Sequence, residues 1–122
     1  MESRRQKRVS SLIREALGEI FMQSGSSFYG RSLVTITQVE VTPDLLIARA
    51  YVSIFNVEDK EAVLTQLQSN VHEIRFQMGK KLRHHLRRMP EIEFFLDNSL
   101  DDAIKIEEIL KKDKDRDKDS ES

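Results

Sequence analysis

The stretch of residues 33–55, LVTITQVEVTPDLLIARAYVSIF, predicts a β-hairpin. Its first half, Leu33–Val41, is rich in β-branched residues, and its apolar phase changes just after Ile36, which indicates a β-bulge. The sequence Thr-Pro-Asp at 42–44 suits a turn, because proline fixes the φ angle. In the second half, Leu45–Phe55, alternate residues form an apolar face that we expect in the core. The two halves should therefore pair as antiparallel strands.

An amphipathic helix is predicted before the hairpin, over residues 4–23, where apolar residues recur at helical spacing. Residues 24–32, SGSSFYGRS, are rich in serine and glycine and predict a loop. Basic residues crowd the first turns of the helix, where the helix dipole disfavours positive charge. They are Arg4, Arg5, Lys7 and Arg8. This group is either a solvated terminus or an arm that touches phosphate.

A second helical pattern follows the hairpin and keeps one apolar phase over residues 63–86. That length is unusual for a single helix of a globular protein, so we expect a kink inside it. Asn56 is expected to cap its start, and Pro90 is expected to end it. The expected kink comprises Asn70, Val71 and His72.

The residues after the second helix predict a strand and then a charged tail. Glu91–Leu96 has the pattern of a third strand, residues 97–99 suit a turn, and a short helix should end near Leu110. Residues 111–122, KKDKDRDKDSES, contain no apolar residue and predict a disordered charged tail. The order of elements predicts one α+β domain over residues 1–110, with a three-stranded sheet packed against helices.

Positive charge is concentrated in one segment, although the formal net charge of the chain is only −1. Residues 75–88, RFQMGKKLRHHLRR, contain no acid, and on an ideal helical wheel most basic residues face away from the apolar ones. The basic arc comprises Lys80, Lys81, Arg83, His84, Arg87 and Arg88, with Arg75 nearer the apolar side. Because acids that would pair with them locally are missing, a phosphate-rich partner explains the bias better than a merely solvated helix face.

The sequence leaves the burial of two ring side chains in this segment to be decided. Phe76 falls among the basic residues, where it is either an exposed ring that stacks on a base or a side chain covered by a neighbouring loop. Of these two alternatives we favour burial. His85 falls nearer the apolar side of the wheel and predicts a half-buried packing histidine.

The sequence offers no recognisable catalytic or metal-binding motif. It contains no cysteine, which excludes disulfides and thiolate zinc sites. Its three histidines form no His-x-x-His or Glu-x-x-His pair, and no glycine-rich phosphate loop is present. The N-terminal stretch does not have the pattern of a signal peptide, and no run approaches the roughly 20 apolar residues of a membrane span. We therefore expect a cytoplasmic protein that is not an enzyme, binds no cofactor or metal, and does not enter a membrane.

Three segments together resemble the bacterial ribosome-binding factor A family. They are VTITQVEVTPDLLIARAYVSIFN (34–56), MGKKLR (78–83) and PEIEFFLDNSLDDAIKIEEIL (90–110). The resemblance implies a KH-like domain of type II, in which a kinked long helix replaces the Gly-x-x-Gly loop of ordinary KH domains. The family usually marks this kink with Ala-x-Gly, and the chain departs from that pattern with Asn70, Val71 and His72.

The resemblance also implies a function. It implies a monomeric, non-enzymatic assembly factor that binds the immature small (30S) ribosomal subunit and its 16S rRNA, assists late rRNA processing and is linked to cold adaptation. We predict RNA contacts from the following residues: Arg4, Arg5, Lys7, Arg8, Arg75, Lys80, Lys81, Arg83, His84, Arg87 and Arg88. The alternative is a protein–protein adaptor that uses the basic segment and the acidic segment after it as two docking faces.

Overall fold

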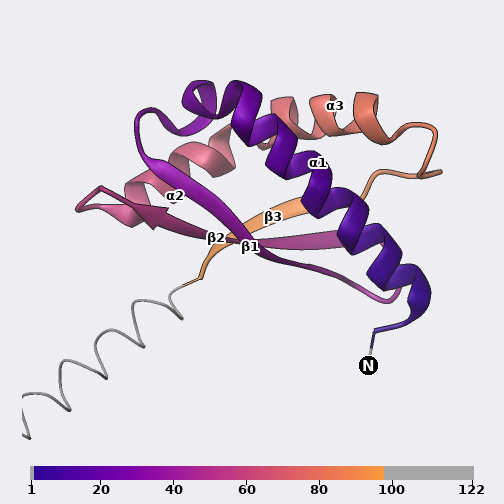
Figure 1. Ribbon diagram of the computed structural model, residues 1–122. Helices are drawn as coiled ribbons and strands as arrows, with labels where there is room; N and C mark the ends of the chain where they lie inside the picture. The colour runs from indigo at the N-terminus through magenta and orange to yellow at the C-terminus, as the bar shows by residue number, and fades with distance from the viewer. Residues whose placement is uncertain (1, 98–122) are drawn as a thin grey trace, which may run out of the picture.

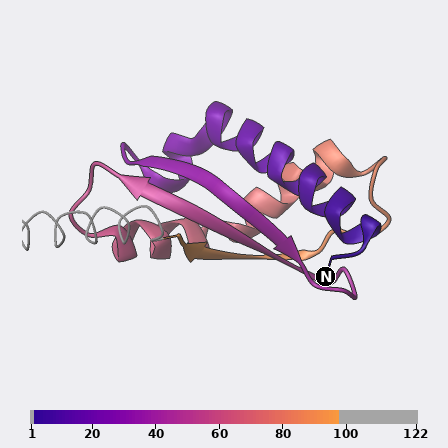
Figure 2. The ribbon, with the colours of Figure 1, turned by 60° about the horizontal axis from the view of Figure 1, so that its bottom comes forward.

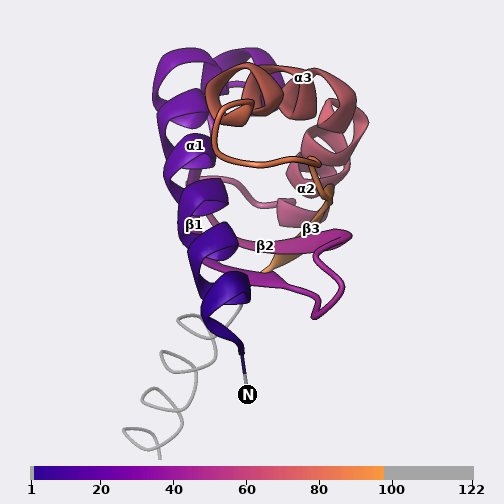
Figure 3. The same ribbon diagram turned by 90° about the vertical axis from the view of Figure 1, so that its right-hand side faces the viewer.

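The computed structural model describes residues 2–97, which form three helices and a three-stranded sheet (Figure 1). Along the chain the elements are α1 (Arg4–Tyr29), β1 (Leu33–Val41), β2 (Ile47–Phe55), α2 (Lys60–Ser69), α3 (Val71–Leu82) and β3 (Glu91–Leu96). Figure 3 shows that the helices gather on one face of the sheet. The predicted α+β class is therefore confirmed. The predicted short helix and charged tail lie outside the described residues.

The sheet has the order β1-β2-β3, and it is mixed. β1 pairs with β2 in antiparallel fashion, as the hairpin prediction requires, whereas β2 pairs with β3 in parallel. The register of the hairpin shifts between Ile36 and Gln38, which confirms the predicted bulge. The parallel pairing follows from topology, because α2 and α3 carry the chain back across the sheet before β3 begins.

The turn of the hairpin is longer than predicted, so β2 begins at Ile47 rather than at Leu45. The N–H of Leu45 donates to the carbonyl of Thr42 at 2.8 Å, and the N–H of Thr42 donates to the carbonyl of Ile47 at 2.9 Å. Leu45 adopts a φ of 63°, in the left-handed region, which no regular strand accommodates. Leu45 and Leu46 therefore belong to the turn.

α1 extends to Tyr29, so the predicted loop at 24–32 is wrong for its first six residues. Phe28 and Tyr29 are buried, and the Tyr29 ring packs edge-on against Phe21 with centroids 5.3 Å apart. This burial outweighs the poor helix propensity of the serines and glycine in the last turns. The helix ends at Gly30, whose φ of 69° suits glycine.

The break in the second helical pattern falls at Asn70, as predicted. The side-chain amide of Asn70 donates to the carbonyl of Gln66 at 2.9 Å and to the carbonyl of Phe28 at 3.3 Å. The kink is therefore tied to the end of α1. The predicted cap at Asn56 is wrong, because Asn56 has a φ of 64° after β2, and the side chain of Asp59 caps α2 instead.

α3 ends at Leu82 and does not continue to Pro90 as predicted. The N–H groups of His85 and Leu86 both donate to the carbonyl of Leu82, at 2.8 and 3.0 Å, and close a turn there. Since Glu91 must pair opposite Ile47 of β2, the chain has to leave the helix early enough to reach the sheet. The predicted basic arc is therefore not one continuous helical face.

The core lies between the helices and the sheet. The apolar faces predicted for α1 and β2 are mostly buried, including Ile13, Leu17 and Val52. Leu46, which the alternation placed on the core face, is 40% exposed because it belongs to the turn. Leu86 and Met89 are half-buried and pack against the core, although they lie beyond the end of α3. They hold the segment before β3 against the rest of the domain.

Candidate nucleic-acid interface

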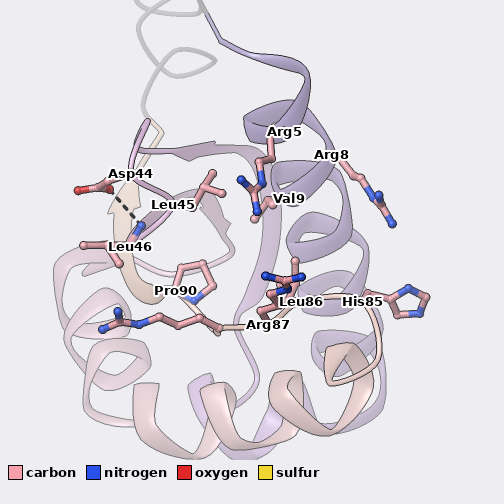
Figure 4. Close-up of a pocket in the computed structure, with 11 residues that line it drawn as sticks. Arg5, Arg8, Val9, Asp44, Leu45, Leu46, His85, Leu86, Arg87 and Pro90 are labelled. Carbon is pink, nitrogen blue, oxygen red and sulfur yellow. Dashed lines mark hydrogen bonds between the residues drawn. The ribbon is translucent and has the colours of Figure 1, made fainter.

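Figure 2 shows that the start of α1, the hairpin turn and the entrance to β3 lie at one end of the molecule. A hollow lined by arginines lies between these segments. Its volume is about 480 Å³, and we call it the cationic hollow. Its lining comprises Arg5, Arg8, Val9, Asp44, Leu45, Leu46, His85, Leu86, Arg87, Arg88 and Pro90. Figure 4 shows Arg5 pointing into the hollow, whereas Arg8 and His85 extend outward at its edge.

A strand pairing and two hydrogen bonds bring these segments together. Parallel pairing places Glu91 opposite Ile47, and the N–H of Glu91 donates to the carbonyl of Leu46 at 2.8 Å. The segment before β3 therefore returns to the hairpin turn. At the start of α1 the buried side-chain amide of Gln6 donates to the carbonyl of Val41 at 2.9 Å, which fixes the first turn of the helix beside the end of β1.

The arginines of the hollow are exposed, and the described residues provide them with no acidic partner. Within residues 2–97, no ion pair to a carboxylate is formed by Arg4, Arg5, Lys7, Arg8, Arg87 or Arg88. The lining of the hollow contains four arginines and one carboxylate, that of Asp44. Like charges held this close raise the local positive potential, and a bound anion would relieve it.

The carboxylate of Asp44 accepts hydrogen bonds from two residues of its own turn. Its Oδ1 accepts from the hydroxyl of Thr42 at 2.6 Å and from the N–H of Leu46 at 3.1 Å, the second of which is drawn in Figure 4. The hydrogen bond from Thr42 has the larger effect on the pKa of Asp44, and that from Leu46 adds to it. Both lower this pKa below its ordinary value, because they stabilise the charged carboxylate. The carboxylate is therefore ionised at neutral pH and stabilises the turn.

Arg75 holds the segment before β3 onto α3. Its Nε donates to the carbonyl of Pro90 at 3.2 Å, and its Nη2 donates to the carbonyl of Met89 at 3.1 Å. The side chain is half-buried. These bonds use two of the five N–H groups of the guanidinium. The main role of Arg75 in the structure is therefore to position the loop that carries Arg87 and Arg88. The sequence pattern did not predict this structural role.

Lys81 and Lys80 have different environments, although both were predicted on the basic arc. The ammonium of Lys81 lies 3.1 Å from the carboxylate of Glu19 on α1, so its charge is paired within the protein. The ammonium of Lys80 lies over the ring of Phe76, 4.5 Å from its centroid. The Phe76 side chain is 58% exposed, so the favoured prediction that it is buried is wrong.

Arg83, His84 and His85 lie at or just beyond the end of α3 and are exposed. Nε of Arg83 donates to Nε2 of His84 at 3.2 Å. The prediction of a half-buried His85 is wrong, because the helical wheel on which it rested ends at Leu82. His85 instead lies at the edge of the cationic hollow.

A second hollow, of about 420 Å³, lies along α3. It is lined by His72, Arg75, Phe76, Gly79, Lys80, Arg83 and Met89. Of the predicted kink residues, Asn70 and Val71 are half-buried, and the exposed His72 lines this second hollow. Seven of the predicted RNA-contact residues line one of the two hollows. Arg5, Arg8, Arg87 and Arg88 line the cationic hollow, and Arg75, Lys80 and Arg83 line the second. Arg4, Lys7, Lys81 and His84 line neither.

Sequence reasoning missed Leu45, Leu46 and His85 as lining residues of the cationic hollow. A signal for the two leucines existed, since they are apolar residues directly after a Thr-Pro-Asp turn. Their meeting with the segment before β3 depends on the parallel register of β2 and β3, which no local pattern encodes.

Within the part of the chain that the structure describes, no three His, Cys, Asp or Glu side chains gather as a metal ion would need. Across the same residues, no helix is both long and apolar enough to cross a bilayer.

The fold and the cationic end define a small α+β protein with the electrostatic footprint expected of a nucleic-acid-binding module. The family model for ribosome-binding factor A matches residues 5–110, and the chain belongs to this family. Ribosome-binding factor A of Cytophaga hutchinsonii is 37% identical to it over 112 residues, which are 92% of this chain and 84% of that protein.

Structures of the family share the fold. The crystal structure of ribosome-binding factor A from Thermus thermophilus matches with a TM-score of 0.63 at 20% identity, over 75% of this chain and 94% of that chain. A homology model of the Thermus thermophilus factor, fitted into a cryo-EM map of a complex with the 30S subunit, matches with a TM-score of 0.58 at 22% identity. That match covers 73% of this chain and 91% of the other.

Proposed function

We propose that this protein is a non-enzymatic assembly factor that binds the immature small ribosomal subunit through its 16S rRNA and assists late maturation. The observation that carries the proposal is the convergence of Arg5 and Arg8 with Arg87 and Arg88 around one hollow. Membership of the ribosome-binding factor A family supports it, as does the Thermus thermophilus relative that was fitted into a 30S complex.

The chemistry of the proposed contact is phosphate binding. Arginine presents planar N–H donors that match phosphate oxygens, and each neutralised phosphate releases counterions. Arginines on both sides of a hollow can contact phosphates on two strands, or on one strand that bends, and so favour a particular RNA conformation. Arg4 and Lys7 would add to the positive field beside the hollow.

The kinked pair α2 and α3 completes the proposal. The family resemblance implies a KH-like domain in which two helices meet at the position where ordinary KH domains carry a Gly-x-x-Gly loop that clamps nucleotides. Here the two helices meet at Asn70, whose side chain bonds the kink to α1. We propose that the kink gives α3 its direction and so determines where the residues at its C-terminal end meet RNA.

The test is cosedimentation of the protein with purified immature small subunits. The triple variant Arg83→Glu, Arg87→Glu and Arg88→Glu should lose association with the subunit while its circular dichroism and unfolding midpoint stay unchanged, because all three side chains are exposed. A matched control reverses Arg14, Arg31 and Arg49, which are exposed and lie outside both hollows. Normal association of the first variant would show that the assigned surface is wrong.

A further inference from the structure

The second hollow combines an exposed aromatic ring with positive charge. His72, Phe76 and Lys80 follow one another at intervals of four residues on α3, so they lie on one helix face. Arg83 extends this face at the end of the helix, and Met89 lines the hollow from the segment that Arg75 holds in place. The lining contains no carboxylate.

Phe76 is the most exposed of the six phenylalanines, ahead of Phe95 at 39%. Its side chain is 58% exposed, whereas Phe21, Phe28 and Phe94 are at most 8% exposed. The contact that the structure gives the ring is the ammonium of Lys80, 4.5 Å from its centroid. A cation over an exposed ring is held weakly, so Lys80 can leave the ring for a phosphate at little cost.

Gly79 keeps the space beside the ring open. Glycine in a helix interior lowers helix stability relative to alanine. The packing of the domain does not require it, because a Cβ built at Gly79 meets no atom within 4 Å. The glycine instead leaves the backbone of α3 accessible in the lining of the hollow, next to Phe76 and Lys80.

We propose that this hollow binds one unpaired RNA base, stacked on Phe76, with Lys80 and Arg83 on the adjoining phosphates. Only a base that is free of its neighbours can present a face to an aromatic side chain, so the ligand is a single-stranded segment rather than a duplex. The inference rests on the proposed function and adds a specific element to it: the cationic hollow binds phosphate, and the second hollow selects single-stranded RNA.

The chain contains no tryptophan, so the variant Phe76→Trp provides a single fluorescent reporter at the proposed site. Stacking of a base quenches indole fluorescence. Oligouridylate should quench this variant at saturation, whereas inorganic polyphosphate, which carries charge without bases, should bind and leave the emission nearly unchanged. The matched control is Phe95→Trp on β3, where the ring is partly exposed and packs against Tyr51. This control should bind oligouridylate with no comparable quenching.

An affinity measurement provides the second arm. The variant Phe76→Ala should bind oligouridylate roughly tenfold more weakly, in the range expected for loss of one stacked base, with unchanged affinity for polyphosphate. The proposal is overturned if oligouridylate saturates Phe76→Trp without quenching, or if Phe76→Ala weakens both ligands equally. In either case the proposed function would still stand if the variant with Arg5, Arg8, Arg87 and Arg88 all changed to alanine loses subunit association, because none of these four residues lines the second hollow.

Discussion

Nε of Arg75 on α3 donates to the carbonyl oxygen of Pro90, at 3.2 Å, and so joins the helix to the entrance of β3. A second bond from the same guanidinium reaches Met89. This one side chain fixes a segment that contributes Pro90 to the cationic hollow and Met89 to the second, and Arg75 itself lines the second. The positions of Arg87 and Arg88 therefore depend on Arg75, which the sequence pattern predicted as an RNA contact.

Replacement of Arg75 by methionine should lower the free energy of unfolding by about 2 kcal/mol, because two hydrogen bonds from a charged donor are lost. It should also weaken RNA binding more than the loss of one charge does, since the loop carrying Arg87 and Arg88 is released. Urea unfolding and RNA titration measure the two effects. The matched change Lys80→Met, at an exposed position of the same helix, should leave stability within about 0.5 kcal/mol of the parent. Equal stability of the two variants would contradict the role assigned to Arg75.

Asn70 should stabilise the kink through its side-chain amide. The variant Asn70→Ala loses the bonds to Phe28 and Gln66 and favours a continuous helix, so its free energy of unfolding should fall by about 1 kcal/mol. Ser69→Ala, one residue earlier, removes an exposed local bond and should cost less. Both values come from denaturant unfolding. If Asn70→Ala is as stable as the parent, the side chain does not fix the junction of α2 and α3.

Two glycines of α1 should respond in opposite directions to alanine. A Cβ at Gly25 would meet the buried ring of Tyr29, whereas a Cβ at Gly18 meets no atom within 4 Å. Gly25→Ala should therefore destabilise the protein by about 1–3 kcal/mol through overpacking. Gly18→Ala should stabilise it by up to about 1 kcal/mol, because alanine is the better helix former. Thermal unfolding compares them directly, and a stabilising Gly25→Ala would refute the packing described for the last turns of α1.

Burial raises the pKa of Tyr29 above its ordinary value of 10.0. A group whose pKa is higher in the folded state binds its proton more tightly there, so its contribution to stability is complete below the pKa of the unfolded chain. That contribution is lost as the pH rises through and above about 10. Unfolding measured on both sides of this pH should show a loss of stability that Tyr29→Phe reduces. An identical alkaline loss in the variant would assign the effect to other groups.

Regular local patterns predicted much of the fold. The β-branched residues of Leu33–Val41 and the pattern of Glu91–Leu96 predicted the bounds of β1 and β3, and the bulge was predicted from a change of apolar phase. Long-range packing decided the rest. Tyr29 continues α1 through a serine-rich stretch because its ring is buried against Phe21. In the sequence, Leu86 continues the apolar spacing of the helix. In the structure it lies in the turn after α3 and still packs against the core, so periodicity alone could not show where α3 ends.

The sequence predicted many residues of the candidate site but not how they are arranged in space. The basic character of the N-terminus and of residues 75–88 is visible in the sequence. Their division into two hollows is not, because it depends on the early end of α3 and on the register of β3 against β2. The pairing of Lys81 with Glu19 likewise requires the packing of α3 against α1.

The central claim is that the arginines of the cationic hollow bind phosphates of ribosomal RNA. The most direct test is the salt dependence of affinity for a 16S rRNA fragment, measured for the parent and for a variant with Arg5, Arg8, Arg87 and Arg88 all changed to alanine. Each lost phosphate contact should reduce the slope of log K against log salt by about 1, so the variant should be shallower by about 3 to 4. The exposed arginines Arg14, Arg31 and Arg49, changed together to alanine, should leave the slope unchanged. Equal slopes for parent and quadruple variant, or an affinity of the parent for RNA that salt does not weaken, would contradict the account and favour a protein–protein adaptor.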